Sequence, residues 1–254
     1  MTQLPSEKPA LFKGRHFNHL LIIQAVRWYV TYLRHEVASI TVKTARAGLH
    51  PLFHQRFSTG MNKELVVHTT VMRWVQCFVP VFEKKWKKYA RPVGSSWRVD
   101  ETYIKVKGEW RYLYRAVDKQ GQTVDFLLSK NRNKAAAVRF FKKAIGNNEI
   151  PEKITLDGSQ ASHQAVAELK AEGVLPAQTL VRTNKYLNNM IEQDHRKVKQ
   201  RCYPMLGFKT FGNAEVTLSG IELANKIKKG QFDTSGITSP GAMIPQVWEA
   251  VLAA

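Results

Sequence analysis

The sequence predicts an α/β protein in which a mixed sheet with flanking helices follows a smaller helical region. Three observations predict this fold class. β-rich runs in residues 95–130 are separated only by short turn signals, which is typical of an antiparallel meander. Helical and strand-like segments then alternate up to residue 201, an order that favours helices packed against a sheet. Residues 10–90, in contrast, have helical patterning.

The composition indicates a folded protein that binds a polyanion. The 254 residues are 44% hydrophobic, which is enough to bury a core. Lysine and arginine total 39 against 20 acids, so the net charge of +19 suits nucleic acid or an anionic membrane. The membrane is the weaker candidate, because Gln24 and Arg27 interrupt the apolar run at residues 20–30, which is too short to span a bilayer.

The N-terminal residues and the two cysteines favour a protein of the reducing cytoplasm. The first 16 residues have no apolar core of the kind found in a secretory signal. Cys77 and Cys202 lie far apart and outside any CxxC spacing, so neither a disulfide framework nor a cysteine zinc site is indicated.

The clearest element of the helical region is the segment 68–78, HTTVMRWVQCF. Thr69 or Thr70 can cap its start. Its apolar residues recur at the spacing of one helix face: Val71, Trp74, Val75 and Phe78. The other side carries Met72, Arg73 and Gln76. A recognition helix in a helix-turn-helix has this layout, with Arg73 and Gln76 as DNA contacts, and an ordinary amphipathic helix fits the segment equally well.

The elements that follow can be placed from turn and stop signals. Turns at 107–109 and 119–121 divide the first three strands. Gly146 and Gly173 stop two helices. In order, the later segments are helix 133–146, strand 152–157, helix 162–173, strand 180–183, helix 185–201 and helix 213–230.

Three acids in this region form a candidate metal site: Asp100, Asp157 and Glu192. An acid inside a strand, such as Asp100, is costly unless it is paired or binds a ligand. Asp157 ends a strand, where α/β folds commonly place ligand-binding groups. Taken singly, Asp157 also fits a turn before Gly158, and Glu192 fits an ion pair with Arg196. Carboxylate oxygens suit Mg²⁺ or Mn²⁺ rather than zinc.

The chain resembles the DDE transposases of bacterial insertion sequences, within the retroviral-integrase-like ribonuclease H superfamily, and most closely the insertion-sequence-six family. The resemblance covers residues 12–32 and 68–230. The stretches that carry it are FKGRHF, AVRWY, HTTVMRWVQ, VDETYIKVKGEWRYLYRAVDKQGQTVDF, TLDGSQAS, NNMIEQDHRKVKQR and GFKTF. The spacing from Asp157 to Glu192 fits the family pattern, as does Lys199, seven positions after Glu192.

The resemblance implies a ribonuclease H-like sheet and a metal-dependent transposase. Asp100, Asp157 and Glu192 are then the catalytic residues and hold two ions of Mg²⁺ or Mn²⁺. Water would free a 3′-OH at the end of the element, and this 3′-OH would attack a target phosphodiester. No covalent protein–DNA intermediate is needed, so Tyr103 and Tyr186 are interpreted as packing residues or DNA contacts.

The helix at 185–201 combines the acid with cations. Seven residues are nearly two helical turns, so Lys199 shares a face with Glu192. We expect Lys199, Arg196 and Arg201 to contact DNA phosphates. A second stripe is suited to packing on the sheet and consists of Leu187, Ile191, Val198 and Cys202.

The family implies partners and a domain order. The partners are double-stranded DNA, as terminal inverted repeats and target, and a second copy of the chain, because two ends must be brought together. The protein is expected in the bacterial cytoplasm, at the nucleoid. The expected order is a helical DNA-binding region at 1–92, a catalytic domain at 93–230 and a peripheral tail at 231–254.

The segment 33–67 does not resemble the family. Where the first helix of a helix-turn-helix is expected, it carries His35, His50 and His54, with His68 at its edge, and no clear amphipathic period. One hypothesis is a local change of reading frame, which would damage end recognition and leave the catalytic region intact. A histidine metal cluster is the weaker hypothesis, because the spacing matches no known ligand pattern.

Two other function classes remain open at this point. A DNA-binding protein without catalysis, such as a helix-turn-helix regulator or a decayed transposase, accounts for the charge and for helix 68–78, and has no need of the three acids. A different nuclease of the same fold would act on RNA–DNA hybrids or junctions, whereas the basic helical region favours a sequence-specific DNA substrate.

Overall fold

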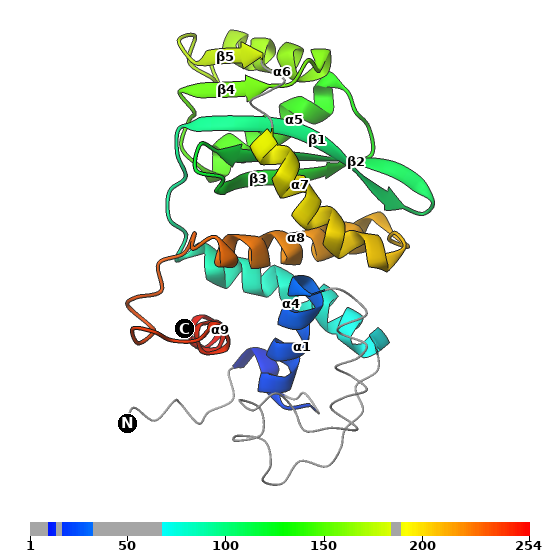
Figure 1. Cartoon of the computed structure of the whole chain (residues 1–254), viewed down its shortest axis with the longest axis vertical. Helices are drawn as coiled ribbons and strands as arrows, with labels where there is room; N and C mark the ends of the chain where they lie inside the picture. The colour runs from blue at the N-terminus through cyan, green and yellow to red at the C-terminus, as the bar shows by residue number, and fades with distance from the viewer. Residues whose placement is uncertain (1–9, 14–16, 33–67, 184–188) are drawn as a thin grey trace.

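The computed structural model describes residues 10–13, 17–32, 68–183 and 189–254 (Figure 1). The atypical segment 33–67, with His35, His50 and His54, lies outside the described residues, as do Tyr186 and Leu187. In the described part of the chain, no helix is long and apolar enough to cross a membrane.

A five-stranded sheet forms the upper part of the molecule in Figure 1. Its strands are β1 (Ser96–Val106), β2 (Glu109–Asp118), β3 (Thr123–Ser129), β4 (Lys153–Leu156) and β5 (Leu180–Thr183). The spatial order is β3-β2-β1-β4-β5. β1, β2 and β3 pair antiparallel, and β4 and β5 continue the sheet in parallel with β1. This confirms the predicted mixed sheet.

The β1–β2 connection is a two-residue turn. Lys107 and Gly108 have φ values of 54° and 81°, and positive φ at both positions matches the right-handed twist of the two strands. The turn fixes the register, in which Val106 lies opposite Glu109 and Asp100 opposite Arg115. The predicted meander is therefore correct in both its strands and its turns.

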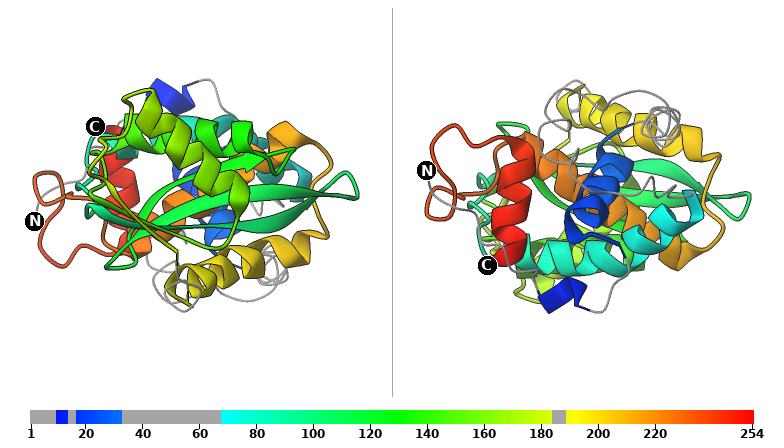
Figure 2. Two further views of the ribbon diagram at one scale, coloured as in Figure 1. Left: turned by 90° about the horizontal axis from the view of Figure 1, so that it is seen from above. Right: turned by 90° about the horizontal axis from the view of Figure 1, so that it is seen from below.

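The two faces of the sheet bury separate cores. Helices α5 (Lys134–Asn147) and α6 (Gln160–Ala171) cover the face that carries Trp97 and Val99. Helices α7 (Asn189–Cys202) and α8 (Phe211–Lys228) cover the opposite face, where Ile104 is buried. Figure 2 shows α7 on one side of the sheet and α5 and α6 on the other.

The N-terminal helices pack on the far side of α8 (Figure 1). They are the short 3₁₀ helix η1 (Ala10–Phe12), α1 (His19–Thr31) and α4 (His68–Lys87). Gly220 allows α8 to approach them closely, because a Cβ there would lie 2.7 Å from Val30 and 3.0 Å from Val79. The helical region and the sheet therefore share one hydrophobic core through α8.

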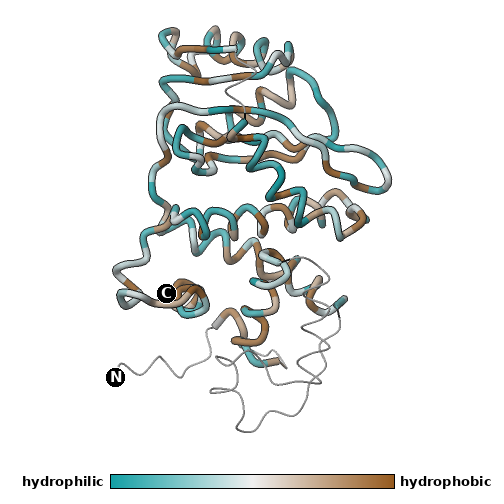
Figure 3. Tube along the Cα trace, viewed as in Figure 1, coloured by the Kyte–Doolittle hydropathy of each residue, from teal (hydrophilic) through white to brown (hydrophobic). Residues whose placement is uncertain are grey.

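The C-terminal segment differs from the expectation of a peripheral tail. It forms α9 (Ile244–Ala253), which packs against α1 and α4. Trp248, Val251 and Leu252 are buried, and Trp248 meets Phe82 and Trp86 edge to face. Figure 3 shows that α9 and α1 are largely apolar, whereas α7 is mainly hydrophilic. This short amphipathic helix carries no family motif, yet it completes the core of the helical region.

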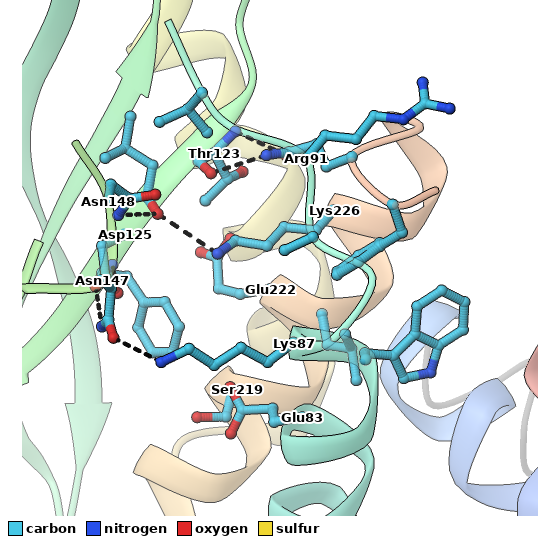
Figure 4. A pocket seen from close by; sticks show the side chains of 18 of the residues that line it. Glu83, Lys87, Arg91, Thr123, Asp125, Asn147, Asn148, Ser219, Glu222 and Lys226 are labelled. Carbon is cyan, nitrogen blue, oxygen red and sulfur yellow. Dashed lines mark hydrogen bonds between the residues drawn. The ribbon is translucent and has the colours of Figure 1, made fainter. Parts of the chain in front are cut away.

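A cavity of about 530 Å³ lies along the outer edge of β3 (Figure 4). Side chains reach across it to the carbonyl oxygens of the edge strand: Lys143 donates to Phe126 at 2.6 Å, and Lys226 donates to Val124 at 3.4 Å. Asn148 also donates to Val124. Covering the free edge in this way protects it from pairing with another strand.

Candidate active site

Two carboxylates leave the sheet side by side where β4 ends. β1 and β4 run parallel, and their pairing ends at Val99 opposite Leu156. Asp100 and Asp157 are the next residues on their strands. Because β1 continues and β4 does not, the sheet opens at this point and leaves room for a ligand. The structure therefore brings together two of the three acids that the sequence predicts.

A third carboxylate in the cluster is Glu101, which sequence reasoning missed. Oxygens of Asp100, Glu101 and Asp157 all lie within 4.8 Å of one another. Neighbouring residues on a strand point to opposite faces, so Asp100 and Glu101 reach the cluster from the two sides of the sheet. This is possible only beyond the end of β4. The sequence signal for Glu101 was its position directly after Asp100, in a strand that is longer than the strand predicted at 152–157.

Glu101 has its own partners on the side of α6. Ser162 donates its hydroxyl to Glu101 at 2.9 Å, and Arg132 forms an ion pair with it at 3.3 Å. Arg132 also lies 3.9 Å from Asp157. Burial raises the pKa of Glu101, whereas the bond from Ser162 lowers it. Arg132 therefore contacts both Glu101 and Asp157, and within the described residues no lysine or arginine forms an ion pair with Asp100.

The environment of Asp100 disfavours its negative charge. Burial raises its pKa to about 7, and the charges of Asp157, Glu101 and Glu192 add to the rise. A hydrogen bond from the backbone N–H of Glu101, at 2.8 Å, acts in the opposite direction. A crowded set of oxygen donors with unbalanced negative charge fits a hard divalent cation, which would relieve the repulsion.

Glu192 stands beside this cluster rather than inside it. It lies exposed in the first turn of α7, and its charge acts on Asp100. His195 follows three positions later on the same helix, and its Nδ1 lies 3.6 Å from an oxygen of Asp100. Since residues three apart share a helix face, α7 presents Glu192 and His195 toward β1 together.

His195 is buried against Asp100 as a neutral ring. Burial lowers its pKa to about 3, and the charges of Arg115 and Lys199 lower it further. Its Nε2 is buried without a hydrogen-bond partner in the described part of the chain. The imidazole therefore packs over Asp100 without supplying a positive charge at neutral pH.

A buried ion network fixes α7 on the sheet. Arg115 of β2 is fully buried, and it contacts Asp194 of α7 and Glu222 of α8, each at 2.7 Å. Lys229 joins Asp194 at 2.9 Å. Burial would raise the pKa of Asp194, but the charges of Arg115 and Lys229 outweigh it and lower the pKa. The network holds α7 at Asp194, which is two positions after Glu192 in the helix.

The predicted packing stripe of α7 is confirmed where it is described. Ile191, Val198 and Cys202 are buried. Of the predicted DNA contacts on this helix, Arg196 and Lys199 are exposed and Arg201 is half-buried.

The two DNA contacts predicted on α4, Arg73 and Gln76, differ in their exposure to solvent. The apolar face of the helix is buried as expected, and Arg73 is exposed. Gln76 is half-buried instead, and its amide donates to the backbone oxygen of Asn213 and to the hydroxyl of Thr217 on α8. The structure therefore leaves Arg73 facing solvent and uses the amide group of Gln76 to join two helices.

Comparison with known proteins finds a matching family and relatives that are transposases. A family described as a DDE domain matches residues 94–231. The transposase for insertion sequence-like element IS431mec of Staphylococcus aureus is 37% identical over 212 residues, which cover 83% of this chain and 85% of that protein. The transposase for insertion sequence element IS257 in transposon Tn4003 of Staphylococcus aureus matches with the same identity and coverage.

Solved structures with a similar arrangement are retroviral integrase domains. The catalytic core domain of HTLV-2 integrase in complex with magnesium, in a trimeric form, aligns with a TM-score of 0.41 and 16% identity over 63% of this chain and 99% of that one. The catalytic core domain of BIV integrase aligns with a TM-score of 0.40 and 14% identity over 60% and 91%.

Proposed function

Because the chain belongs to the DDE transposases of bacterial insertion sequences, we propose that it uses Asp100, Asp157 and Glu192 to cut the 3′ ends of an element and join them to target DNA. The observation that carries the proposal is the meeting of Asp100 and Asp157 at the open end of the β1–β4 pair. The charge of Glu192, in the first turn of α7, acts on Asp100 and supports its inclusion in the proposed site.

The acids would hold divalent cations, as two ions of Mg²⁺ or Mn²⁺. Such ions supply activation of the attacking oxygen and stabilisation of the leaving oxygen in an in-line displacement at phosphorus. Asp100 and Asp157 provide ligands from rigid strands, and Glu192 provides one from the first turn of α7. Glu101 is engaged by Ser162 and Arg132, and we assign it a supporting role.

The remaining residues would position DNA. Lys199 and Arg196 are exposed on α7, with Arg201 in its last turn, and we propose that they contact phosphates near the cut bond. Arg73 would contact the terminal inverted repeat from α4, with Gln76 holding that helix against α8. Two copies of the chain would bring two element ends together, in the bacterial cytoplasm at the nucleoid.

A DNA-binding protein without catalysis gains nothing from the acid cluster. Burial, together with the charges of the neighbouring carboxylates, raises the pKa of Asp100 and Glu101 and so costs free energy of folding where these groups are ionised. A regulator that binds DNA through cations alone does not need a destabilising cluster of acids. No observation favours this alternative.

The test is a nicking assay on candidate end sequences. Purified protein is incubated with labelled duplex ends in Mg²⁺ and, as a control, in EDTA, and the position of any nick is mapped. Asp100→Asn is expected to abolish nicking and to leave duplex affinity within about twofold, since it removes a ligand and no cation that contacts DNA. Magnesium-dependent nicking that survives in Asp100→Asn would refute the assignment.

A further inference from the structure

An exposed aromatic surface lies on the β1–β2 hairpin, next to the acid cluster. Trp110 is 61% exposed and Tyr103 is 46% exposed. With Tyr112 and Lys105 they form the hairpin patch. A group of large exposed aromatic rings on one surface is typical of a binding site, because exposing apolar rings to water is unfavourable.

The rings of the hairpin patch form a continuous surface. Tyr103 lies opposite Tyr112 in the strand register, with ring centroids 5.5 Å apart. Trp110 meets Tyr103 edge to face at 6.5 Å. Lys105, opposite Trp110, places its ammonium 5.9 Å from the indole centroid. A cation is thus interleaved with aromatic faces, as in surfaces that bind unpaired nucleic acid.

The hairpin patch continues directly from the candidate active site. Alternate residues of a strand share a face, so Tyr103 and Lys105 lie on the same side of β1 as Glu101. Each step of two residues advances about 7 Å along the strand. Arg132 reaches this side of β1, because it pairs with Glu101 at 3.3 Å.

The edge of β1 between the two regions is free of β4. Pairing with β4 stops at Val99, and the next backbone partner is Phe208, which bonds to Lys105 and Lys107 at the hairpin end. A strand of DNA that passes the acid cluster can therefore follow this edge to the hairpin patch.

We propose that the hairpin patch binds unpaired bases of a DNA strand next to the bond that is cut. The bases stack on Trp110 and Tyr103, and Lys105 and Arg132 contact the adjoining phosphates. This inference rests on the proposed function. A second copy of the chain is a poorer occupant, because protein interfaces are depleted in lysine at their centre, where Lys105 would lie.

The experiment measures binding of the full chain to a labelled thymidine homopolymer in EDTA, by fluorescence anisotropy. Trp110→Ala and Tyr103→Ala are each expected to weaken binding about tenfold, the effect of losing one stacked base. Trp110→Phe keeps a stacking face and is expected to retain most of the affinity. The matched control is Ile150→Ala, at a residue that is 48% exposed on a distant loop and is expected to bind normally.

Two further measurements separate bases from backbone. Trp110→Ala should leave the salt dependence of binding unchanged, since stacking displaces no counterions, whereas Lys105→Ala should reduce it. A blunt duplex of the same length should bind Trp110→Ala within about twofold of the wild type, because its bases are already stacked. An equal loss on the duplex, or unchanged binding of the homopolymer, would overturn the proposal.

The same variants distinguish the other possible outcomes. If Trp110→Ala lowers the sedimenting mass of the protein, the hairpin patch is an interface between copies and the inference is wrong. If the wild type nicks duplex ends while Trp110→Ala binds the homopolymer normally, the inference fails and the proposed function stands. If the wild type neither nicks nor binds the homopolymer, the proposed function fails as well.

Discussion

Folding strongly changes the pKa of Asp100 at the candidate active site. Its pKa rises from an ordinary value of 3.8 to about 7. The folded state therefore binds this proton more tightly than the unfolded state does. The stabilisation is complete below pH 4 and is lost as pH rises toward 7, where ionised Asp100 faces Asp157 and Glu101.

We therefore expect Asp100→Asn to stabilise the metal-free protein at pH 8. Asparagine keeps the shape of the side chain and removes the repelled charge, so the free energy of unfolding should rise by about 1–3 kcal/mol. Urea unfolding in EDTA at pH 8 and at pH 5 measures the difference, which should be small at the lower pH. Addition of Mg²⁺ should raise the melting temperature of the wild type and not that of the variant. A variant less stable than the wild type at pH 8 would mean that the carboxylate is compensated in some other way.

The exposed cations of α7 give a separate prediction about binding. Lys199→Ala and Arg196→Ala should each weaken duplex binding and reduce the slope of log affinity against log salt by about 1. Titrations at several salt concentrations measure this slope. Lys228→Ala, at an exposed lysine of α8, is the control. Unchanged slopes for both α7 variants would show that these cations only balance neighbouring acids.

At the scale of elements, the placement of α7 depends on Arg115. Replacing it with methionine removes the cation that Glu222 contacts at 2.7 Å and leaves Asp194 with Lys229 as its close cation. Loss of one partner in such a network costs about 3–5 kcal/mol. We expect this loss for Arg115→Met in denaturant unfolding.

A combined variant separates stability from positioning. Arg115→Met with Asp194→Leu, Glu222→Met and Lys229→Met removes all four charges of the network and should recover most of the stability. Nicking should stay below the wild-type rate, because α7 is no longer locked in the register that presents Glu192. A combined variant that nicks at the wild-type rate would mean that the apolar face of α7, at Ile191 and Val198, is sufficient to place the helix.

The elements that the sequence predicts correctly are those with local signals. The meander follows from its turns, and Asp157 follows from its position after a short apolar strand. Helix α4 extends beyond the segment 68–78 whose apolar spacing indicated a helix, and it continues to Lys87. Pro80 is unfavourable inside a helix, yet Phe82 and Trp86 extend the buried face and outweigh that cost.

The charged core could not be predicted, because it joins residues that are remote in sequence. Arg115 and Asp194 are 79 positions apart, and Arg115 and Glu222 are 107 positions apart. In the sequence, Asp194 is one acid among the cations of a polar helix. Only the approach of α7 and α8 to β2 makes it an internal partner. Glu101 was missed for a related reason, since the end of β4 decides whether it can meet Asp100.

At the scale of the whole molecule, the C-terminal helix completes the core of the helical region. Trp248 is 2% exposed and contacts both Phe82 and Trp86. Trp248→Ala should lower the free energy of unfolding by about 3–5 kcal/mol, as truncation of a buried tryptophan does. Ile244→Ala, at a residue that is 53% exposed, is the matched control and should change it by less than about 0.5 kcal/mol. Near-equal stabilities of the two variants would mean that α9 detaches without disturbing the rest.

The close contact of α8 at Gly220 with Val30 and Val79 joins the helix that carries Arg73 to the sheet that carries Asp100. Within the described residues, the two parts are packed on each other through α8, so we expect them to move as one unit. If α4 contacts the terminal repeat as proposed, the protein would fix the distance between those base pairs and the phosphodiester that is cut. Inserting one base pair into an element end should move the nick by one nucleotide relative to the tip of the element, while its distance from the footprint stays constant.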